Sequence, residues 1–300
     1  MLSRGTLWQK IVATTDAAII SGALLPVPTD HRVIEEGRIR YLVRVLARLR
    51  RKDEARKAQD KAAAAGRKFN PFLPPEPALT VGQVSSTHSA VLNKFNVVEH
   101  HLLIVTKQFE NQETLLTPGD FEALWLCMAE YEGLGFYNGG KEGGASQEHK
   151  HLQLVPLPLA PDGPAIPLEP LLAEASGGHD EILNIPAFPF RHAFVRLEPE
   201  LWKQPAAVAR HCFELYAMLL RRVGMQPPGP GNLSRQSHPY CLLATRQWML
   251  LVPRSQEHFK GVSLNSLAYA GSFFVRDEQQ LAMLRKAGPL RALAETAYPR

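Results

Sequence analysis

The chain has 300 residues and a formal net charge of +5, with 45% hydrophobic and 21% charged residues, a composition typical of soluble globular proteins. No apolar run approaches the roughly 20 residues that cross a bilayer, which excludes a helical transmembrane protein. Three unclustered cysteines predict no disulfide framework and favour the reducing cytoplasm. The length suffices for one large domain or two smaller ones.

The N-terminal segment is predicted to form an amphipathic helix near residues 7–21. Its arginine and apolar stretch are also features of a signal peptide. However, Leu7, Ile11 and Ala18 recur at helical spacing, and Lys10 and Asp16 interrupt the apolar stretch, so a helix is the better interpretation.

The rest of the first half is predicted to contain strands and one further helix. Thr117 begins this helix, because Pro118 fits a first turn and Asp120 and Glu122 lie near its positive end. The other elements are a strand at 39–45, a proline-rich ordered loop at 68–79, two strands within 91–106 around a turn at 96–100, and strands at 134–137 and 151–156.

The clearest break in the chain is residues 156–170, which contain six prolines. We therefore place a domain boundary near Ser176, between residues 1–175 and 176–300. The second half is predicted to contain a helix at 206–223, a loop at 224–232, strands within 240–253 and a helix at 278–296.

Positive charge is concentrated between Arg38 and Lys68, where 12 lysines and arginines face three acids. This segment carries +9, so the remainder of the chain carries −4. A nucleic-acid surface would add interleaved aromatic residues and a binding motif, and neither is present. We interpret residues 53–66 as a solvated basic helix or a disordered segment. In the alternative, Lys52 or Lys68 helps to hold a highly charged polyphosphate.

The strongest functional signal is the alternation of His149, His151 and Gln153. If this segment is a strand, the three side chains share one face, whereas Leu152 and Leu154 point into a core. Two imidazoles and an amide on one face suit histidine-based attack on a phosphate.

Two other interpretations compete with this one. Imidazole is a common zinc ligand, but no third ligand follows at metal spacing, since Cys127, Cys212 and Cys241 are scattered and Glu148 would point the other way. An isolated H-x-H pattern on a strand is also often incidental.

The residues before the motif favour the phosphate interpretation. Residues 143–147 form a loop whose backbone N–H groups can bind anionic oxygens. Glycine-rich loops are often only turns, so this role depends on the histidines nearby. The predicted phosphate contacts are Asn138, Gly144, Ser146 and Gln147.

The motif resembles the signature of the histidine-triad superfamily, in the H-x-H-x-Q form of its nucleotidyltransferase branch. That branch contains galactose-1-phosphate uridylyltransferases and diadenosine tetraphosphate phosphorylases (ATP adenylyltransferases). Words similar to the phosphorylases occur in the family's order, and the likeness covers most of the chain. They are LNKFNVVEHHLLIVT (92–106), GASQEHKHLQ (144–153), YCLLATRQWMLLVPRS (240–255) and VSLNSLAYAGSFFV (262–275).

The resemblance implies an α+β fold, with antiparallel sheet backed by helices and two histidine-triad-like halves, of which only the first is catalytic. Residues 91–105 and 240–254, each with a turn between apolar runs, suggest the internal repeat. By the same resemblance His151 is the nucleophile, His149 orients the site and Gln153 donates to the phosphoryl oxygens or the leaving group.

Further roles follow from the resemblance and from charge. Asn93 occupies the place of a ribose-binding asparagine, and Lys94 would meet a phosphate. His101 falls on a recurrent histidine of the superfamily, with either a site role or a packing role. Arg254 and Lys260 are candidates for the distal phosphates, and His192 faces either the cleft or solvent. The chain departs from the family at Cys241, where asparagine is expected.

The implied function is phosphorolysis of diadenosine tetraphosphate to ATP and ADP through an adenylylated His151. The alternatives are a dinucleoside polyphosphate hydrolase, an adenylylsulfate phosphorylase, or a nucleotide-binding sensor without activity. The motif requires no cofactor and no protein-bound metal, and Mg²⁺ would enter only with the substrate polyphosphate. Small nucleotides are the expected partners, rather than nucleic acid or membrane, and two halves in one chain favour a monomer.

Overall fold

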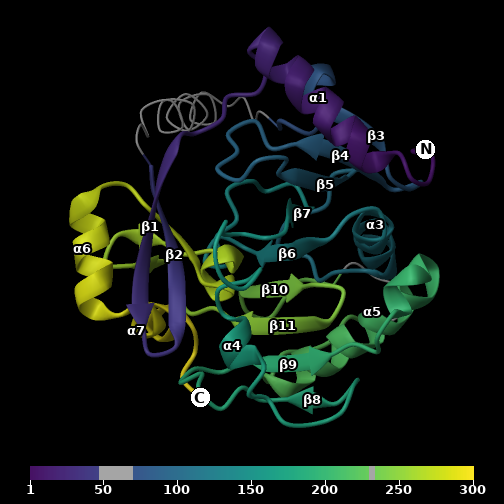
Figure 1. The fold of residues 1–300 in the computed structure, drawn as a ribbon. Coiled ribbons are helices and arrows are strands. Elements are labelled where there is room, and N and C mark those ends of the chain that lie inside the picture. Colours follow the sequence, from purple (N-terminus) through teal and green to yellow (C-terminus); the bar gives the residue numbers. More distant parts are fainter. Residues whose placement is uncertain (47–69, 230–233) are drawn as a thin grey trace.

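The computed structural model describes residues 1–46, 70–229 and 234–300 (Figure 1). Lys52, Lys68 and the basic helix predicted near 53–66 lie outside the described residues, as does the end of the loop predicted at 224–232. In the part of the chain that is described, no helix is long and apolar enough to cross a membrane.

Nine strands form one antiparallel sheet through the molecule (Figure 1), in the order β3-β4-β5-β7-β6-β10-β11-β9-β8. The predicted α+β architecture is therefore confirmed. The strands are β3 (Thr80–Gln83), β4 (His88–Leu92), β5 (Leu102–Thr106), β6 (Gly133–Gly139), β7 (His151–Pro156), β8 (Ile182–Leu183), β9 (Ala193–Arg196), β10 (Tyr240–Ala244) and β11 (Trp248–Pro253).

Three helices share a core with one face of this sheet: α1 (Leu7–Ser21), α3 (Pro118–Met128) and α5 (Pro205–Arg222). Leu152 and Leu154 of β7 point into this core, as their alternation predicted. The start of α3 is also as predicted, because Thr117 and Asp120 form a reciprocal capping box at its first turn.

The other face of the sheet packs against a smaller sheet of β1 (Thr29–Glu36), β2 (Ile39–Leu46) and β14 (Ser272–Val275). The remaining elements are α4 (Glu169–Leu172), β12 (His258–Phe259), β13 (Val262–Ser263), α6 (Glu278–Ala287) and α7 (Pro289–Thr296). The single helix predicted over 278–296 is wrong. Gly288 has φ 90° and Pro289 starts a new helix, so the backbone changes direction there.

The main sheet contains an internal repeat. Each half runs strand–strand–helix–strand–strand, as β4-β5-α3-β6-β7 and as β8-β9-α5-β10-β11. The two halves have the same spatial strand order and meet where β6 pairs with β10. The repeat therefore relates β4–β5 to β8–β9, which corrects the sequence-based comparison of residues 91–105 with residues 240–254.

Candidate active site

The predicted motif lies at the start of β7, which begins with His151. Gln153 follows two residues later, and therefore shares the face of His151. His149 precedes the strand and forms an isolated bridge with Asn111. The prediction of one strand through all three residues is thus correct only for the last two. The Phe72 ring still packs against both imidazoles, with its centroid 5.6 Å from that of His149 and 5.4 Å from that of His151.

One hydrogen bond defines the state of His151. Its Nδ1 lies 2.8 Å from the carbonyl oxygen of His149, which can only accept, so Nδ1 carries the proton. Nε2 then keeps the lone pair. Burial lowers the pKa of His151 to about 4, against the opposing effect of this hydrogen bond. At neutral pH the side chain is therefore an uncharged imidazole with a nucleophilic Nε2.

His149 has a different environment. Its Nε2 donates to the backbone oxygen of Thr106 at 2.8 Å, and its Nδ1 lies 2.9 Å from the amide nitrogen of Asn70. Both ring nitrogens are thus occupied, which argues against the zinc pair considered for the motif. The imidazole instead connects β5 to the proline-rich loop, and its orienting role stays a prediction.

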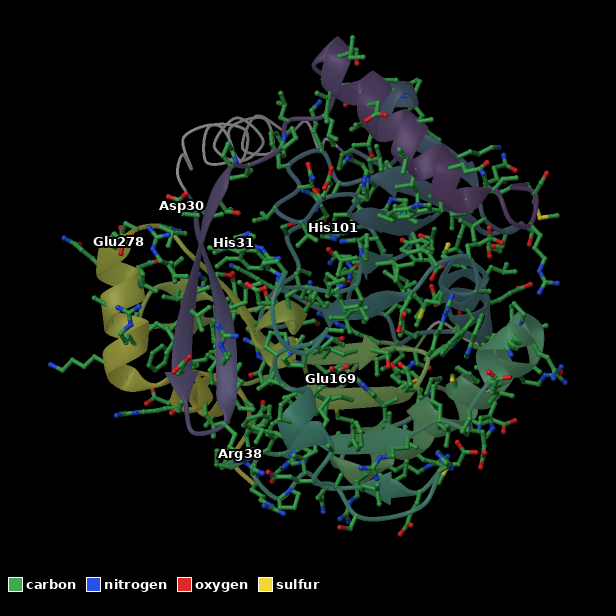
Figure 2. The ribbon with its side chains drawn as sticks, in the orientation of Figure 1. Asp30, His31, Arg38, His101, Glu169 and Glu278 are labelled. Carbon is green, nitrogen blue, oxygen red and sulfur yellow. The ribbon has the colours of Figure 1, made fainter. Side chains whose placement is uncertain are left out.

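Gln153 is held by a chain of hydrogen bonds. His101 Nε2 lies 3.0 Å from Gln153 Oε1, and His101 Nδ1 lies 3.2 Å from the amide nitrogen of Asn93. Because His101 donates to the oxygen of the Gln153 amide, the NH₂ group is the end that can donate to a ligand. Figure 2 shows His101 beside the main sheet, between α1 and the hairpin that carries Asp30 and His31.

Asn93 therefore acts on His101 in this structure. Its Oδ1 also accepts from the Phe95 N–H at 3.3 Å, so both ends of the amide have partners within the protein. The contact of Asn93 with ribose stays a prediction. His101 takes part in the site, through Gln153, rather than in packing alone.

Residues of the second half form hydrogen bonds to residues around the motif. Asn138 lies at the end of β6, and its Oδ1 accepts from Ser266 N at 3.0 Å and from Ser266 Oγ at 2.7 Å. The NH₂ group of Asn138 is therefore the end that can bind substrate. Cys241 pairs with Asn138 across β6 and β10, and its thiol donates to the Gly143 oxygen at 3.4 Å. The residue that departs from the family thus holds the glycine-rich loop.

The glycine-rich loop differs from the prediction. The N–H groups of Gly143 and Ala145 donate to the Gly140 oxygen, each at 3.1 Å, and Gly144 N donates to the Lys141 oxygen at 2.8 Å. These three donors close the turn itself and do not form an anion-binding nest. Gly144 is needed for the turn, because it has φ 95° and an added Cβ would lie 2.6 Å from Asn265 Cβ.

A buried ionic network lies behind the motif. Lys150 is fully buried, and its Nζ donates to Asp120 Oδ2 at 2.6 Å and to Glu110 Oε2 at 3.0 Å. Asp120 also bonds His88 Nε2 at 3.0 Å. Burial alone would raise the pKa of Asp120, but the Lys150 charge holds it well below the usual range. Breaking such a buried pair typically costs about 3–5 kcal/mol, so Lys150 anchors the motif to α3.

The remaining predicted contacts are dispersed. Lys94 pairs with Glu76 at 2.7 Å on the surface. Ser146 is exposed on the loop before His149, with Gln147 beside it. Lys260 is exposed between β12 and β13, with its side chain over the Phe259 ring.

Arg254 and His192 are structural. Arg254 is fully buried and donates to the backbone oxygens of Thr296 and Leu264, among others, so the predicted role at distal phosphates does not fit. His192 lies directly before β9, and three strands separate β9 from β7. It donates from Nδ1 to the Phe190 oxygen and accepts the Ile185 N–H at Nε2, so it is buried, away from the motif on β7.

The internal repeat shows why the second half carries no equivalent site. β11 has six residues, like β7, and occupies the same place in its half of the sheet. Its first and third residues are Trp248 and Leu250, where β7 has His151 and Gln153. The second half therefore lacks both a nucleophile and an amide donor at these positions.

Comparisons with known proteins identify the family of the chain. A family model described as the Ap4A phosphorylase N-terminal domain matches residues 1–174, where Ap4A is diadenosine tetraphosphate. A second model, the ATP adenylyltransferase C-terminal domain, matches residues 186–299. The chain belongs to the Ap4A phosphorylase family, and it is an enzyme of the ATP adenylyltransferase type.

Individual relatives support this assignment. The chain is similar to diadenosine tetraphosphate phosphorylase 2 of Saccharomyces cerevisiae, with 27% identity over 321 residues that cover 98% of this chain and 95% of the relative. It is also similar to the protein APA1 of the same yeast, with 26% identity over 255 residues, or 77% and 76% of the two chains.

Solved structures show the same fold. The crystal structure of yeast Ap4A phosphorylase Apa2 matches with a TM-score of 0.78 and 23% identity, over 100% of this chain and 96% of that chain. The structure of Apa2 in complex with Ap4A matches with a TM-score of 0.74 and 22% identity, over 100% and 99% of the two chains.

The tautomer and pKa of His151 can be measured directly. In NMR of the ¹⁵N-labelled protein, we expect Nδ1 to carry the proton and the ring to titrate near pH 4. In urea the same ring should titrate near the ordinary value of about 6.5. Because the folded pKa is lowered, the stability linked to His151 is present above about pH 6.5 and decreases as the pH falls toward about 4. A folded-state pKa near 6.5 would contradict this.

Proposed function

We propose that the protein cleaves Ap4A with inorganic phosphate and yields ATP and ADP. The observation that carries the proposal is the neutral His151 imidazole, whose Nδ1 is occupied by the His149 carbonyl. Membership of the Ap4A phosphorylase family supports the choice of substrate. An imidazole of this kind can form a covalent intermediate, which divides one difficult displacement into two easier ones.

The proposed reaction has two half-reactions, which need only His151, Ap4A and inorganic phosphate. His151 Nε2 attacks the α-phosphorus of Ap4A, the bond from that phosphorus to the bridging oxygen breaks, and ATP leaves. An oxygen of inorganic phosphate then attacks the adenylyl group, the P–N bond breaks and ADP forms. Reversal of the two steps makes Ap4A from ADP and ATP and releases inorganic phosphate.

The amides around His151 supply the charge stabilisation in this proposal. The NH₂ groups of Gln153 and Asn138 donate to oxygens of the transferred phosphoryl group, since their amide oxygens are already held by His101 and Ser266. Lys94, Ser146 and Gln147 are the proposed contacts for the outer phosphates. Gly144 shapes the loop, and His149 and Asn93 support the reacting groups.

We also propose that the protein works as a monomer in the cytoplasm. Cys127, Cys212 and Cys241 are buried thiols, as a reducing compartment allows. Within the described residues, no three His, Cys, Asp or Glu side chains are grouped to hold a metal ion, and Mg²⁺ is proposed to enter with the polyphosphate. The proposed division into units is residues 1–175 and 176–300.

Incubation with Ap4A and ³²P-labelled inorganic phosphate tests the reaction. Phosphorolysis should place the label in ADP and leave ATP unlabelled. Unlabelled nucleotide products would indicate a hydrolase. Nucleotide binding without products would indicate a sensor, and turnover of adenylylsulfate but not of Ap4A would indicate the adenylylsulfate enzyme.

The covalent intermediate can be trapped when phosphate is omitted. Ap4A labelled in the α-phosphate should leave acid-labile, base-stable AMP on the protein, because the P–N bond to histidine has these properties. His151→Ala should abolish the label, whereas His149→Ala should only weaken it. Label that persists in the His151 variant would remove this residue from the role.

Gln153 should determine the rate of adenylyl transfer and the choice between phosphate and water as the acceptor. Removing a preorganised donor typically costs about 100- to 1,000-fold, so Gln153→Ala should slow both half-reactions to that extent. An amide cannot titrate, whereas a histidine there can help to activate water. Gln153→His should therefore raise the ratio of AMP release to phosphate-dependent ADP formation. An unchanged ratio would place the choice of acceptor elsewhere.

A further inference from the structure

The pairing of β6 with β7 stops beside the nucleophile. The last paired residues are Phe136 and Gln153, and the same register would bring Tyr137 opposite Leu152 and then Asn138 opposite His151. The side-chain amide of Gln112 lies there instead. Its Oε1 accepts from His151 N at 2.8 Å, and its Nε2 donates to the Asn138 oxygen at 2.9 Å and to the His151 oxygen at 3.2 Å.

Gln112 is itself tightly held. It is only 2% exposed, and its backbone N–H donates to the Glu148 oxygen at 2.7 Å. Its backbone oxygen accepts from the Tyr137 hydroxyl at 2.5 Å. The side chain is therefore a fixed bridge between two strands rather than a surface residue that happens to reach them.

The bridge has a geometric consequence. Paired strands lie about 4.7–4.9 Å apart, and direct backbone bonds between Asn138 and His151 would hold them at that distance. An amide inserted between the two backbones keeps them further apart. The bridge thereby sets the separation between His151 and Asn138, the second of which is also fixed by Ser266.

We propose that Gln112 is a positioning residue that holds His151 and Asn138 on opposite sides of the bound adenylyl phosphate. This inference rests on the proposed function, since it assigns the space between these two side chains to the group transferred in that reaction. Gln112 touches the backbone of His151 and acts through it.

The chemistry of the bridge requires an amide. The His151 N–H needs an acceptor, and the two carbonyl oxygens need a donor, so a single side chain must provide both. Glutamate has the same shape, but its ionised form would place a negative oxygen against two carbonyl oxygens. Protonated glutamic acid restores one donor. Burial and the two carbonyls should raise the pKa of that carboxyl group.

The test compares Gln112→Met with Gln256→Met by rapid-quench kinetics on labelled Ap4A. Gln256 is a matched control, because its exposed amide also donates to a backbone oxygen, that of Glu295. The amplitude of the burst gives the fraction of active enzyme, and the rate constant of the burst gives the rate of adenylyl transfer at each active site. Misplacement of a reacting group by about 1 Å can cost about 100-fold, so we expect a loss of that order in Gln112→Met, little change in AMP affinity and normal rates in the control.

The pH dependence of Gln112→Glu provides a second test, because a purely structural role of Gln112 would not change it. Its rate relative to the wild type should rise as the pH falls, because the protonated acid restores a donor, whereas the relative rate of Gln112→Met should stay flat. A smaller burst with an unchanged rate per site in both variants would overturn the inference.

Hydrogen exchange separates this inference from the proposed function. If the wild type forms no enzyme–AMP, the proposed function fails, but the bridge is still measurable. The His151 amide proton should exchange faster in Gln112→Met than in the wild type or in Gln256→Met, because its acceptor is lost. Unchanged exchange would show that Gln112 does not hold the His151 backbone.

Discussion

The hydrogen bond from His151 Nδ1 to the His149 carbonyl is the interaction on which the site depends. It assigns the proton to one ring nitrogen, and burial keeps the ring uncharged at neutral pH. The bond requires the His149 backbone to stay in place. The His149 ring holds this backbone to Thr106 and Asn70, and the next residue, Lys150, is bonded to Asp120 in the first turn of α3. The His151 ring is thus oriented by neighbouring residues, which act through the backbone of His149.

The same pattern recurs at the amide donors. Gln153 is oriented by His101 and Asn138 by Ser266, and in each case the protein occupies the amide oxygen and leaves the NH₂ group. Donors that are oriented in advance lose little freedom when charge develops on a phosphoryl group. Neutral side chains supply these donors, and the imidazole of His151 beside them is uncharged as well.

Local patterns predicted the elements, and distant contacts escaped prediction. The bounds of β7 follow from alternation, and the start of α3 follows from Thr117 and Asp120, which lie three residues apart. The supports of the site lie far away in sequence. Asn70 is 79 residues from His149, and Ser266 is 128 residues from Asn138. The predicted phosphate contact at Gly144 also missed such neighbours. The turn uses the Gly144 N–H, and Asn265 of the second half packs against this residue.

The pairing of β6 with β10, which joins the two halves of the sheet, affects how the chain folds during synthesis. A nascent chain that has emerged only to residue 175 contains His151 and Gln153 but leaves β6 as an unpaired edge, the kind of edge that invites wrong partners. Asn138 gains its orientation only after Ser266 has emerged. The pair of oriented amides, Gln153 and Asn138, is thus complete only when almost the whole polypeptide has left the ribosome, so partly made chains carry the motif without one of its amide donors in place.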